Sequence, residues 1–459
     1  MLKKLNCRNP FDSTIVWAAC LLLPCTGAAW GQWEQIHKLT AEQGAWRNGF
    51  GWCGCVSGQV IIVGAQEDDH AGTDSGSAYL FDTVTGDLIR KLIADDAATG
   101  DAFGCCVAVS EDIIVVGARF DDDAGGDSGS AYVFDAAKGE QIHKLTADDA
   151  EDFDHFGASV SVSGNTIVVG SRYDDDAGFM SGSAYVFDAV SAEQVHKLTA
   201  DDAAQGDCFG WSVSVNGNTV VVGAPDDSDA GSSTGSAYVF DATTGQQLHK
   251  LTADDGAAYD SFGASVSVSG NIAVVGAACT DDAGESTGSA YIFDVTTGQQ
   301  LHKLTADDGA AYDYFGNSVS ISDATIVVGA IFDDDAGPGS GSVYVFDAPT
   351  GRQLCKLIAE DATAGDRFGE FVFADADSVL VGAPHDEITG SYSGSAYLFQ
   401  QSSPCPADVN DDDVVNIDDL FAVLAAWGTC DNCPEDINDD GKVNIDEVFA
   451  VLGAWGPCP

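Results

Sequence analysis

Basic side chains are scarce in this sequence. Its 459 residues include 18 Lys and Arg against 73 Asp and Glu, so the formal net charge is −55 at pH 7. A surface of that sign repels the phosphates of nucleic acids and of anionic lipids, so nucleic acid and bare membrane are poor partners. Divalent cations are the natural counter-ions of such a chain.

Long apolar runs are also scarce. The run "IVWAACLLL" at residues 15–23 is too short to span a bilayer and ends before Pro24. A basic start precedes it and small residues follow it, which predicts a signal peptide over residues 1–31. We therefore expect a secreted or cell-surface protein without an integral membrane segment. Lipid attachment at Cys25 is the less favoured alternative, because a proline precedes that cysteine.

Proline is sparse at 11 residues, whereas glycine is abundant at 53. With 20% charged residues, the chain is too apolar for a disordered polymer and too rich in glycine for a helical protein. The dipeptide Phe-Gly recurs every 53 residues, and so strict a period indicates a repeat architecture. Its copies begin at Phe50, Phe103, Phe156, Phe209, Phe262, Phe315 and Phe368.

Each repeat contains four short predicted strands. In the unit that starts at Phe156, "ASVSVS" alternates, "GN" supplies a hairpin turn, and "TIVVG" is apolar throughout, as in a strand covered on both faces. "SAYVFD" and "EQVHKLT" form a second hairpin. Four antiparallel strands in about 50 residues is the size of a propeller blade.

The chain begins with the ending of a repeat. "EQIHKLT" at residues 34–40 precedes the first full unit, and the last unit lacks its own copy of that strand. Seven copies of every strand exist only if the N-terminal strand completes the seventh blade. This closes the ring and removes exposed sheet edges. The sequence therefore predicts an all-β, seven-bladed β-propeller over residues 32–401.

The blades resemble a known family. "FG…VVGA" followed by "GSAYVF" resembles the FG-GAP repeat of integrin α-subunits and of bacterial secreted relatives, which implies a propeller fold. Integrin-type repeats often carry an acidic calcium loop before the "VVGA" strand. Here tight turns such as "SGNT" and "NGNT" occupy that place, so we expect no calcium between those strands.

Acidic residues instead cluster after "VVGA". Three loops read "DDDAG", at Asp121–Asp123, Asp174–Asp176 and Asp333–Asp335. One hypothesis is a ring of cation sites. The favoured one is a solvated loop that keeps the protein soluble, because adjacent aspartates in an extended loop point apart.

Nothing in the sequence names a reaction. "GDSGS" at residues 126–130 resembles a protease nucleophile segment, but it aligns with turns in the other blades. Five histidines share one repeat position, which favours a structural role. Only His70, His155 and His385 fall outside that register, and none has triad or metal-ligand spacing. We expect a non-enzymatic protein.

Cysteines divide into two groups. Cys53 and Cys106 share a repeat position, so a bridge between them is an alternative to the favoured interpretation as buried thiols. Four more surround the C-terminal segment, and in an oxidising compartment we expect them to be paired. The symmetric pairing is Cys405 with Cys430 and Cys433 with Cys458, and the crossed pairing stays open.

Residues 402–459 contain a duplicated acidic loop followed by a short apolar helix. "DVNDDDVVNIDDLFAVLAAWG" begins at Asp408, and "DINDDGKVNIDEVFAVLGAWG" begins at Asp436, 28 residues later. Oxygen donors at loop positions 1, 3, 5, 7, 9 and 12 suit Ca²⁺. The predicted ligands are Asp408, Asn410, Asp412, the Val414 carbonyl, Asn416 and Asp419 in loop one, and Asp436, Asn438, Asp440, the Lys442 carbonyl, Asn444 and Glu447 in loop two.

Each loop leads into an apolar stripe at helical spacing. The stripes are Leu420, Val423, Leu424 and Trp427, and Val448, Val451, Leu452 and Trp455. We expect them to bury each other. The duplicated unit resembles a type I dockerin, which implies calcium-dependent docking of an exported protein onto a cohesin partner. The residues at loop positions 10 and 11, Ile417-Asp418 and Ile445-Asp446, are not the usual small hydroxyl pairs, so a cohesin-like protein and a second copy both remain candidate partners.

The favoured hypothesis is an exported binding or adhesion protein. Its propeller would present a recognition face to a protein or carbohydrate ligand, and its calcium-binding tail would attach it. One alternative is an accessory component of an extracellular polysaccharide-degrading complex. Another is a calcium-dependent surface or matrix protein. An asymmetric cluster in one or two blades would favour the enzyme-associated alternative, and the near-identity of the blades argues against one.

Overall fold

The fold is described from a computed structural model of the chain. The described residues are 33–41, 48–387, 393–401, 409, 414–429, 442–453 and 456–457. The predicted signal peptide, the four C-terminal cysteines and six of the predicted calcium ligands lie outside these ranges. Contacts divide the chain into a large unit that ends at Phe399 and a C-terminal unit that begins at Gln400.

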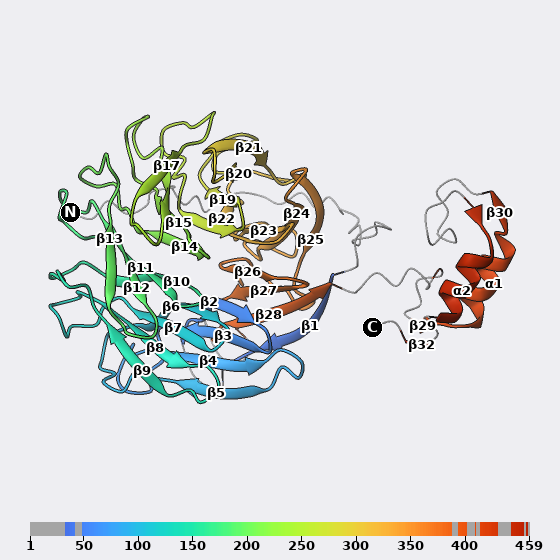
Figure 1. Cartoon of the computed structure of the whole chain (residues 1–459), viewed down its shortest axis with the longest axis horizontal. Helices are drawn as coiled ribbons and strands as arrows, with labels where there is room; N and C mark the ends of the chain where they lie inside the picture. Colours follow the sequence, from blue (N-terminus) through green and yellow to red (C-terminus); the bar gives the residue numbers. More distant parts are fainter. Residues whose placement is uncertain are drawn as a thin grey trace. The chain divides into compact units, whose positions relative to one another are not determined.

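The large unit is a ring of seven four-stranded antiparallel sheets (Figure 1). We number the blades 1 to 7 from the sheet that contains β2. The first strands of the blades lie nearest the centre of the ring in Figure 1. They are β2 (Phe50–Ser57), β6 (Phe103–Ser110), β10 (Phe156–Ser163), β14 (Ser212–Asn216), β18 (Ser265–Ser269), β22 (Phe315–Ser322) and β26 (Val372–Asp375).

The second and third strands form the buried middle of each blade. The second strands are β3 (Val60–Ala65), β7 (Ile113–Ala118), β11 (Thr166–Ser171), β15 (Thr219–Ala224), β19 (Ile272–Ala277), β23 (Thr325–Ala330) and β27 (Ser378–Ala383). The third strands are β4 (Ser77–Asp82), β8 (Ser130–Asp135), β12 (Ser183–Asp188), β16 (Ser236–Asp241), β20 (Ser289–Asp294), β24 (Ser342–Asp347) and β28 (Ser395–Gln401).

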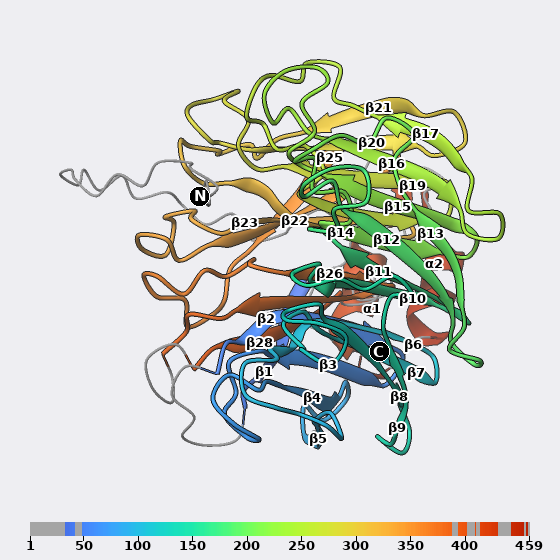
Figure 2. The ribbon, with the colours of Figure 1, turned by 90° about the vertical axis from the view of Figure 1, so that its left-hand side faces the viewer.

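The fourth strands complete the blades, and the seventh of them comes from the start of the chain. They are β5 (Leu88–Leu92), β9 (Gln141–Leu145), β13 (Gln194–Leu198), β17 (Gln247–Leu251), β21 (Gln299–Leu304), β25 (Arg352–Leu357) and β1 (Trp33–Leu39). Blade 7 has the strand order β1-β28-β27-β26, and β1 (blue) lies beside β28 (orange) in Figure 2. The predicted seven-bladed ring, closed by the N-terminal strand, is confirmed.

The phenylalanine of each Phe-Gly dipeptide packs on aromatic rings of its own blade, and the glycine touches the previous blade. The ring of Phe103 meets Tyr132 and Phe134 edge-on, with centroids 5.4 and 5.9 Å apart, and six other blades repeat this trio. A Cβ on Gly117 would lie 2.0 Å from the main-chain oxygen of Gly157 in the next blade. Glycine is therefore required where the two main chains touch.

The polar half of the "SVSVS" pattern joins neighbouring first strands. The N–H of Val215 donates to Ser161 Oγ at 3.0 Å, and the N–H of Val268 donates to Ser214 Oγ at 3.1 Å. Such bonds satisfy donors that the inner edge of an isolated sheet would leave unpaired. The polar residues of this alternating pattern therefore make contacts between blades.

Cysteine takes the place of serine at two positions of the first strands: Cys55 corresponds to Ser161, and Cys53 and Cys106 correspond to Ser159 two residues earlier. The N–H of Val107 donates to Cys53 Sγ at 3.1 Å, and the Cys53 and Cys106 sulfurs lie 3.8 Å apart. The described cysteines are all free thiols. Of the two alternatives for Cys53 and Cys106, the structure shows thiols between the blades and no bridge.

The C-terminal unit pairs two short helices. Helix α1 (Ile417–Ala425) and helix α2 (Ile445–Gly453) pack around four buried valines, Val415, Val423, Val443 and Val451. The duplication extends to the pairing of the two-residue strands. β29 (Val414–Val415), before α1, pairs with β32 (Gly456–Pro457), after α2, and β30 (Gly428–Thr429), after α1, pairs with β31 (Lys442–Val443), before α2.

Only part of each predicted helical stripe is buried. Val423 and Val451 are fully buried, whereas Leu424, Trp427 and Leu452 are 47–52% exposed. The prediction that the stripes bury each other is wrong for these residues, because each helix is apolar on two sides and its partner covers one. No helix in the described part of the chain is long and apolar enough to cross a membrane.

Candidate functional site

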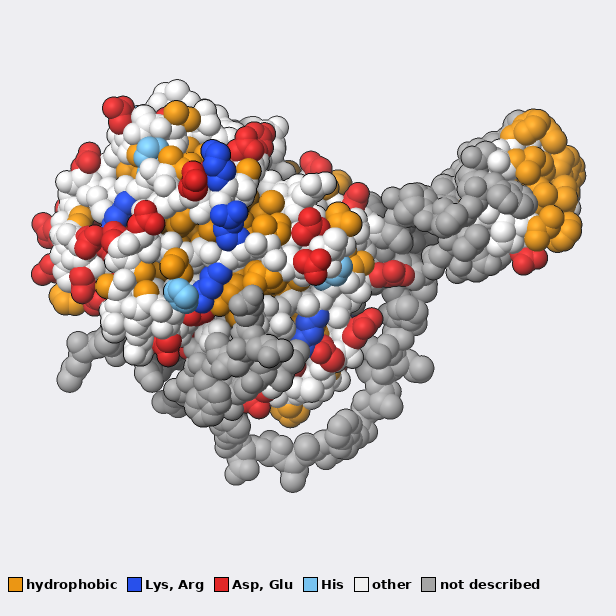
Figure 3. All heavy atoms as spheres, turned by 90° about the horizontal axis from the view of Figure 1, so that it is seen from below, with side chains coloured by type: hydrophobic (Ala, Val, Ile, Leu, Met, Phe, Trp, Pro, Cys, Tyr) orange, Lys and Arg blue, Asp and Glu red, His pale blue; other side chains and the backbone are white. Residues whose placement is uncertain are grey.

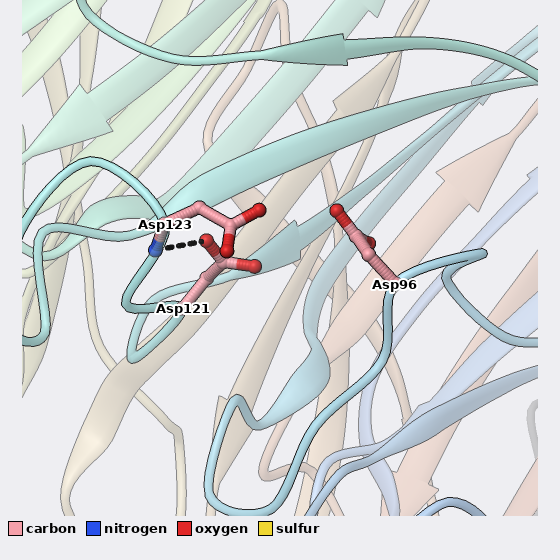
Figure 4. A group of neighbouring side chains, drawn as sticks. All are labelled: Asp96, Asp121 and Asp123. Carbon is pink, nitrogen blue, oxygen red and sulfur yellow. Dashed lines mark hydrogen bonds between the residues drawn. The ribbon is translucent and has the colours of Figure 1, made fainter.

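A lysine joins several aspartates at the same end of most blades. In blade 2, Lys144 of β9 reaches Asp121 and Asp123, which follow β7, and Asp96, which precedes β6. Its Nζ lies 2.8 Å from Asp96, 3.0 Å from Asp121 and 2.5 Å from Asp123. Figure 4 shows these three carboxylates facing one another, and one oxygen of each lies within 4.8 Å of the others.

The same arrangement recurs around the ring, and we call it the lysine station. Blades 2, 3, 4 and 6 have three aspartates, blades 5 and 7 have two, and blade 1 has one in the described residues. In blade 5 Thr280 replaces the first aspartate of the loop. The other stations are Lys197 with Asp149, Asp174 and Asp176; Lys250 with Asp202, Asp227 and Asp229; Lys303 with Asp255 and Asp282; Lys356 with Asp308, Asp333 and Asp335; Lys38 with Asp361 and Asp386; and Lys91 with Asp68.

The charges at the station stabilise one another. Burial alone would lower the pKa of Lys144, but hydrogen bonds with Asp123, Asp96 and Asp121 outweigh burial and raise it. Burial alone would raise the pKa of Asp96, but hydrogen bonds from Lys144 and Tyr132 and the lysine charge lower it. The hydroxyl of Tyr132 also donates to Asp121 at 2.6 Å. The station thus ties the fourth strand to the loops of its own blade and to the linker from the previous blade.

The "DDDAG" loops do not have the geometry that their sequence suggested. The N–H of Asp123 donates to Asp121 Oδ1 at 3.1 Å, which turns the loop so that both carboxylates converge. Asp122 points elsewhere and accepts from the N–H of Asp127 at 2.7 Å. The argument that all three aspartates point apart is therefore wrong. The converging carboxylates could hold a metal ion, but the Lys144 ammonium already contacts all three.

The repeated histidines and serines are part of the scaffold. His196 Nε2 lies 2.9 Å from the carbonyl oxygen of Thr243 in the next blade, and His37, His249 and His302 make the equivalent contact. In the "GDSGS" turn, Ser128 is fully buried, and Ser130 Oγ donates to Asp121 Oδ1 at 3.0 Å. The geometry agrees with the structural interpretation of both motifs.

The described calcium-ligand candidates lie where the acidic loops enter the helices. Asp419 and Glu447, at loop position 12, are 0% and 1% exposed. Asp419 accepts from the N–H groups of Val409 at 2.9 Å and Asn416 at 2.8 Å, and Glu447 accepts from the N–H of Asn444 at 2.5 Å. Two buried carboxylates in so small a unit fit calcium, because buried negative charge needs compensation.

The other predicted ligands divide into those described and those not. Asn416 caps α1 by accepting from the N–H of Asp418 at 2.8 Å. This residue therefore has a structural role in the helix in addition to any role as a calcium ligand. Val414 and Lys442 lie in β29 and β31, whose pairing fixes the main chain at loop position 7. Asp408, Asn410, Asp412, Asp436, Asn438 and Asp440 lie outside the described residues.

The blades differ where their first strands begin and their second strands end. At the position after the second strand, for example, the seven blades carry Gln66, Arg119, Arg172, Pro225, Ala278, Ile331 and Pro384. These residues come close together because a first strand starts beside the end of the second, as Phe103 pairs with Ala118. The non-repeating side chains therefore gather at one end of the ring, around the inner strands.

Six of these side chains form what we call the arginine cluster: Arg119, Phe120, His155, Arg172, Tyr173 and Trp211. The His155 ring lies between Phe120 and Tyr173, with centroids 4.9 and 4.8 Å away. The Arg119 guanidinium lies 4.8 Å from the Phe120 ring, and that of Arg172 lies 5.1 Å from Tyr173 and 4.6 Å from Trp211.

The electrostatics of the arginine cluster differ from those of the stations. Arg119 and Arg172 form no ion pair with an acid among the described residues, and the Nε of each is buried without a hydrogen-bond partner there. Burial, with the charges of Arg172 and Arg119, lowers the pKa of His155 to about 4, so this imidazole is neutral near pH 7. A smaller group lies in blades 6 and 7, where Arg367 stacks on Phe332 at 5.1 Å and lies 3.9 Å from Glu370.

Sequence reasoning missed this cluster. The period of 53 drew attention to what the blades share, and the near-identity of the blades seemed to exclude an asymmetric group. The available signal was the opposite one: His155 and His385 fall outside the histidine register, and arginine appears after "VVGA" or "VVGS" in two blades only.

The match to a protein family agrees with the geometry of the blades. Residues 33–81, 87–134, 140–187, 192–240, 246–293, 299–346 and 352–399 match the FG-GAP repeat. The chain belongs to the FG-GAP repeat family. No curated protein matches this FG-GAP chain. A crystal structure of the computationally designed Ika8 protein is similar over 79% of this chain and 98% of its own, with 18% sequence identity and a TM-score of 0.46.

Proposed function

We propose that this FG-GAP protein is an exported, non-enzymatic binding protein. Its propeller holds a ligand, and its C-terminal unit attaches it to a protein partner in a calcium-dependent manner. The FG-GAP propeller is consistent with binding or adhesion. The repeated histidines and serines make hydrogen bonds within the scaffold, which supports a non-enzymatic role.

One observation carries the attachment proposal: the two helices expose a duplicated apolar face. On α1 the exposed side chains are Ile417, Phe421 and Leu424, and α2 presents Ile445, Phe449 and Leu452 at the same spacing. Figure 3 shows the hydrophobic side chains gathered on one side of the C-terminal unit. Side chains that are 47–63% exposed cost stability in water, so a face of this kind is typical of a docking surface.

Calcium binding would control whether this apolar face is formed. The buried carboxylates Asp419 and Glu447 lie in the first turn of each helix, so an ion held by the loops would fix how the helices start. The N-terminal segment supports export, and a cohesin-like protein or a second copy would be the partner.

A capture experiment tests the proposal. The full-length protein is immobilised, offered extracellular and envelope extract with Ca²⁺, and eluted with a chelator. We expect one specific protein in the eluate, and we expect F421D/F449D to lose it. The matched control is V84D, because Val84 is a 72% exposed apolar residue of the propeller. Equal capture by the wild type and F421D/F449D, or capture that ignores the chelator, contradicts the proposal.

A further inference from the structure

We propose that the arginine cluster binds a carboxylate on an acidic segment of a protein partner. This inference rests on the proposed function, because it names the ligand class of the propeller. The cluster spans blades 2 to 4, and no other blade repeats it among the described residues.

The argument begins with charge. The seven station lysines already contact aspartates, yet Arg119 and Arg172 have no acidic partner among the described residues. Burial lowers the pKa of Arg172, and the charge of Arg119 contributes in the same direction. In a chain with a net charge of −55, two unpaired guanidiniums that repel each other form an isolated cationic site. An anion between them would satisfy both.

The aromatic contacts of the two arginines also fix the orientation of their guanidinium groups. Arg172 stacks on Tyr173 and Trp211, and Arg119 stacks on Phe120, so both planar groups are held before any ligand arrives. A guanidinium presents parallel N–H donors that match the two oxygens of a carboxylate. The neutral imidazole of His155 fills the space between Phe120 and Tyr173 and adds no third charge.

The surroundings favour a peptide over an acidic polysaccharide. A sugar ring recognised by stacking needs an open aromatic face, but the Tyr173 ring already contacts both Arg172 and His155. A polymer with an acid on every unit would also meet the exposed aspartates of the neighbouring loops, such as Asp122 and Asp175. One carboxylate flanked by apolar residues avoids that repulsion and suits the aromatic rim.

Panning a random peptide display library on the full-length protein tests the inference. We expect the enriched peptides to share an Asp or Glu, and replacing that acid with Asn or Gln should weaken binding about tenfold or more. R119Q/R172Q should weaken it by at least the same factor. The matched control is R90Q/R352Q, which removes two exposed arginines of the outer strands and should leave affinity unchanged. R172K, which keeps the charge but lacks the planar fork, should also bind more weakly.

Several results would overturn the inference. Enriched peptides without an acid, or peptides that bind R119Q/R172Q and the wild type equally, would show that the cluster is not the site. So would a galacturonate trisaccharide that binds more tightly than the best peptide. R119Q/R172Q should still capture the partner of the C-terminal unit, so loss of peptide binding and loss of docking report on the two proposals separately.

Discussion

At the scale of single residues, the lysine stations show how a strongly acidic chain stays folded. Lys144 has a side chain that is 20% exposed, and it faces Asp121, which is 4% exposed, together with two more aspartates. Partly buried carboxylates without a cation repel one another, and removing one partner of such a group costs more than the net value of the pair.

Lys144→Met should therefore destabilise the propeller by about 2–4 kcal/mol. The matched control is Lys138→Met, because Lys138 is 64% exposed and its one ion pair among the described residues is with Asp135, so its loss should leave stability nearly unchanged. Denaturant unfolding at neutral pH measures both variants. Equal costs for the two substitutions would show that the station adds nothing beyond a surface ion pair.

A second set of aspartates predicts the pH dependence of stability. Burial, with a smaller contribution from Asp333, raises the pKa of Asp313 to about 7, and Asp101, Asp154 and Asp207 reach about 6. The folded state therefore binds protons that the unfolded state has released, so stability falls as pH rises from about 4 to 7. Below pH 4 the station aspartates with lowered pKa values, such as Asp96, lose their contribution.

Asp313→Asn should flatten this dependence. The Asn side chain keeps an oxygen that can accept the N–H of Ala310, now bonded at 2.6 Å, and blade 1 already carries Asn48 at this position. The measurement is the midpoint of thermal unfolding at pH 5 and at pH 8. The difference between the two should shrink in Asp313→Asn and stay unchanged in Asp307→Asn, an exposed neighbour. An unchanged difference in Asp313→Asn would contradict the assignment.

At the scale of the elements, the period of the sequence predicted the strands well. Phe50 and its six counterparts each begin a blade at or just before the first strand, and β1 completes blade 7, where it pairs with the outer edge of β28. The contacts between elements were not predictable. The motif "DDDAG" does not indicate that Asp123 binds Lys144, which follows it by 21 residues in the sequence. Likewise, "SVSVS" does not indicate that its serines accept hydrogen bonds from the next blade.

Helices α1 and α2 illustrate the same limit. Their spacing predicted amphipathic helices, but both sides of each helix are apolar, and only packing decides which side is covered. Val423 is buried and Phe421 is 59% exposed, although both are apolar residues of one turn.

A substitution in the first turn of α2 tests whether the acidic loop before this helix binds calcium. Glu447→Gln removes the charge of a buried candidate ligand and keeps its size, so it should weaken binding of one calcium ion about tenfold or more. Calorimetric titration of the full-length protein with Ca²⁺ measures the change. Glu34→Gln, in β1 of the propeller, is the matched control and should bind as the wild type does. Unchanged titration of Glu447→Gln would remove that residue from the ligand set.

At the scale of the whole molecule, ring closure depends on the first strand. β1 covers the edge of β28, and Lys38 bonds to Asp361 at 2.5 Å and Asp386 at 2.7 Å. Deleting residues 33–41 should therefore expose a sheet edge, lower the midpoint of thermal unfolding and promote association, as size-exclusion chromatography would show. Deleting residues 402–459 should leave the midpoint of the ring unchanged. Equal effects of the two deletions would contradict closure by β1 as the source of stability.

The central claim is that the ring supplies its own cations whereas the C-terminal loops take calcium. The most direct test is the number of Ca²⁺ ions that the full-length protein binds, counted by native mass spectrometry or by calorimetry at neutral pH. The account predicts two ions, both absent after deletion of residues 402–459. Ions that remain bound to the ring after this deletion would contradict it, because they would have to displace the lysines from their stations.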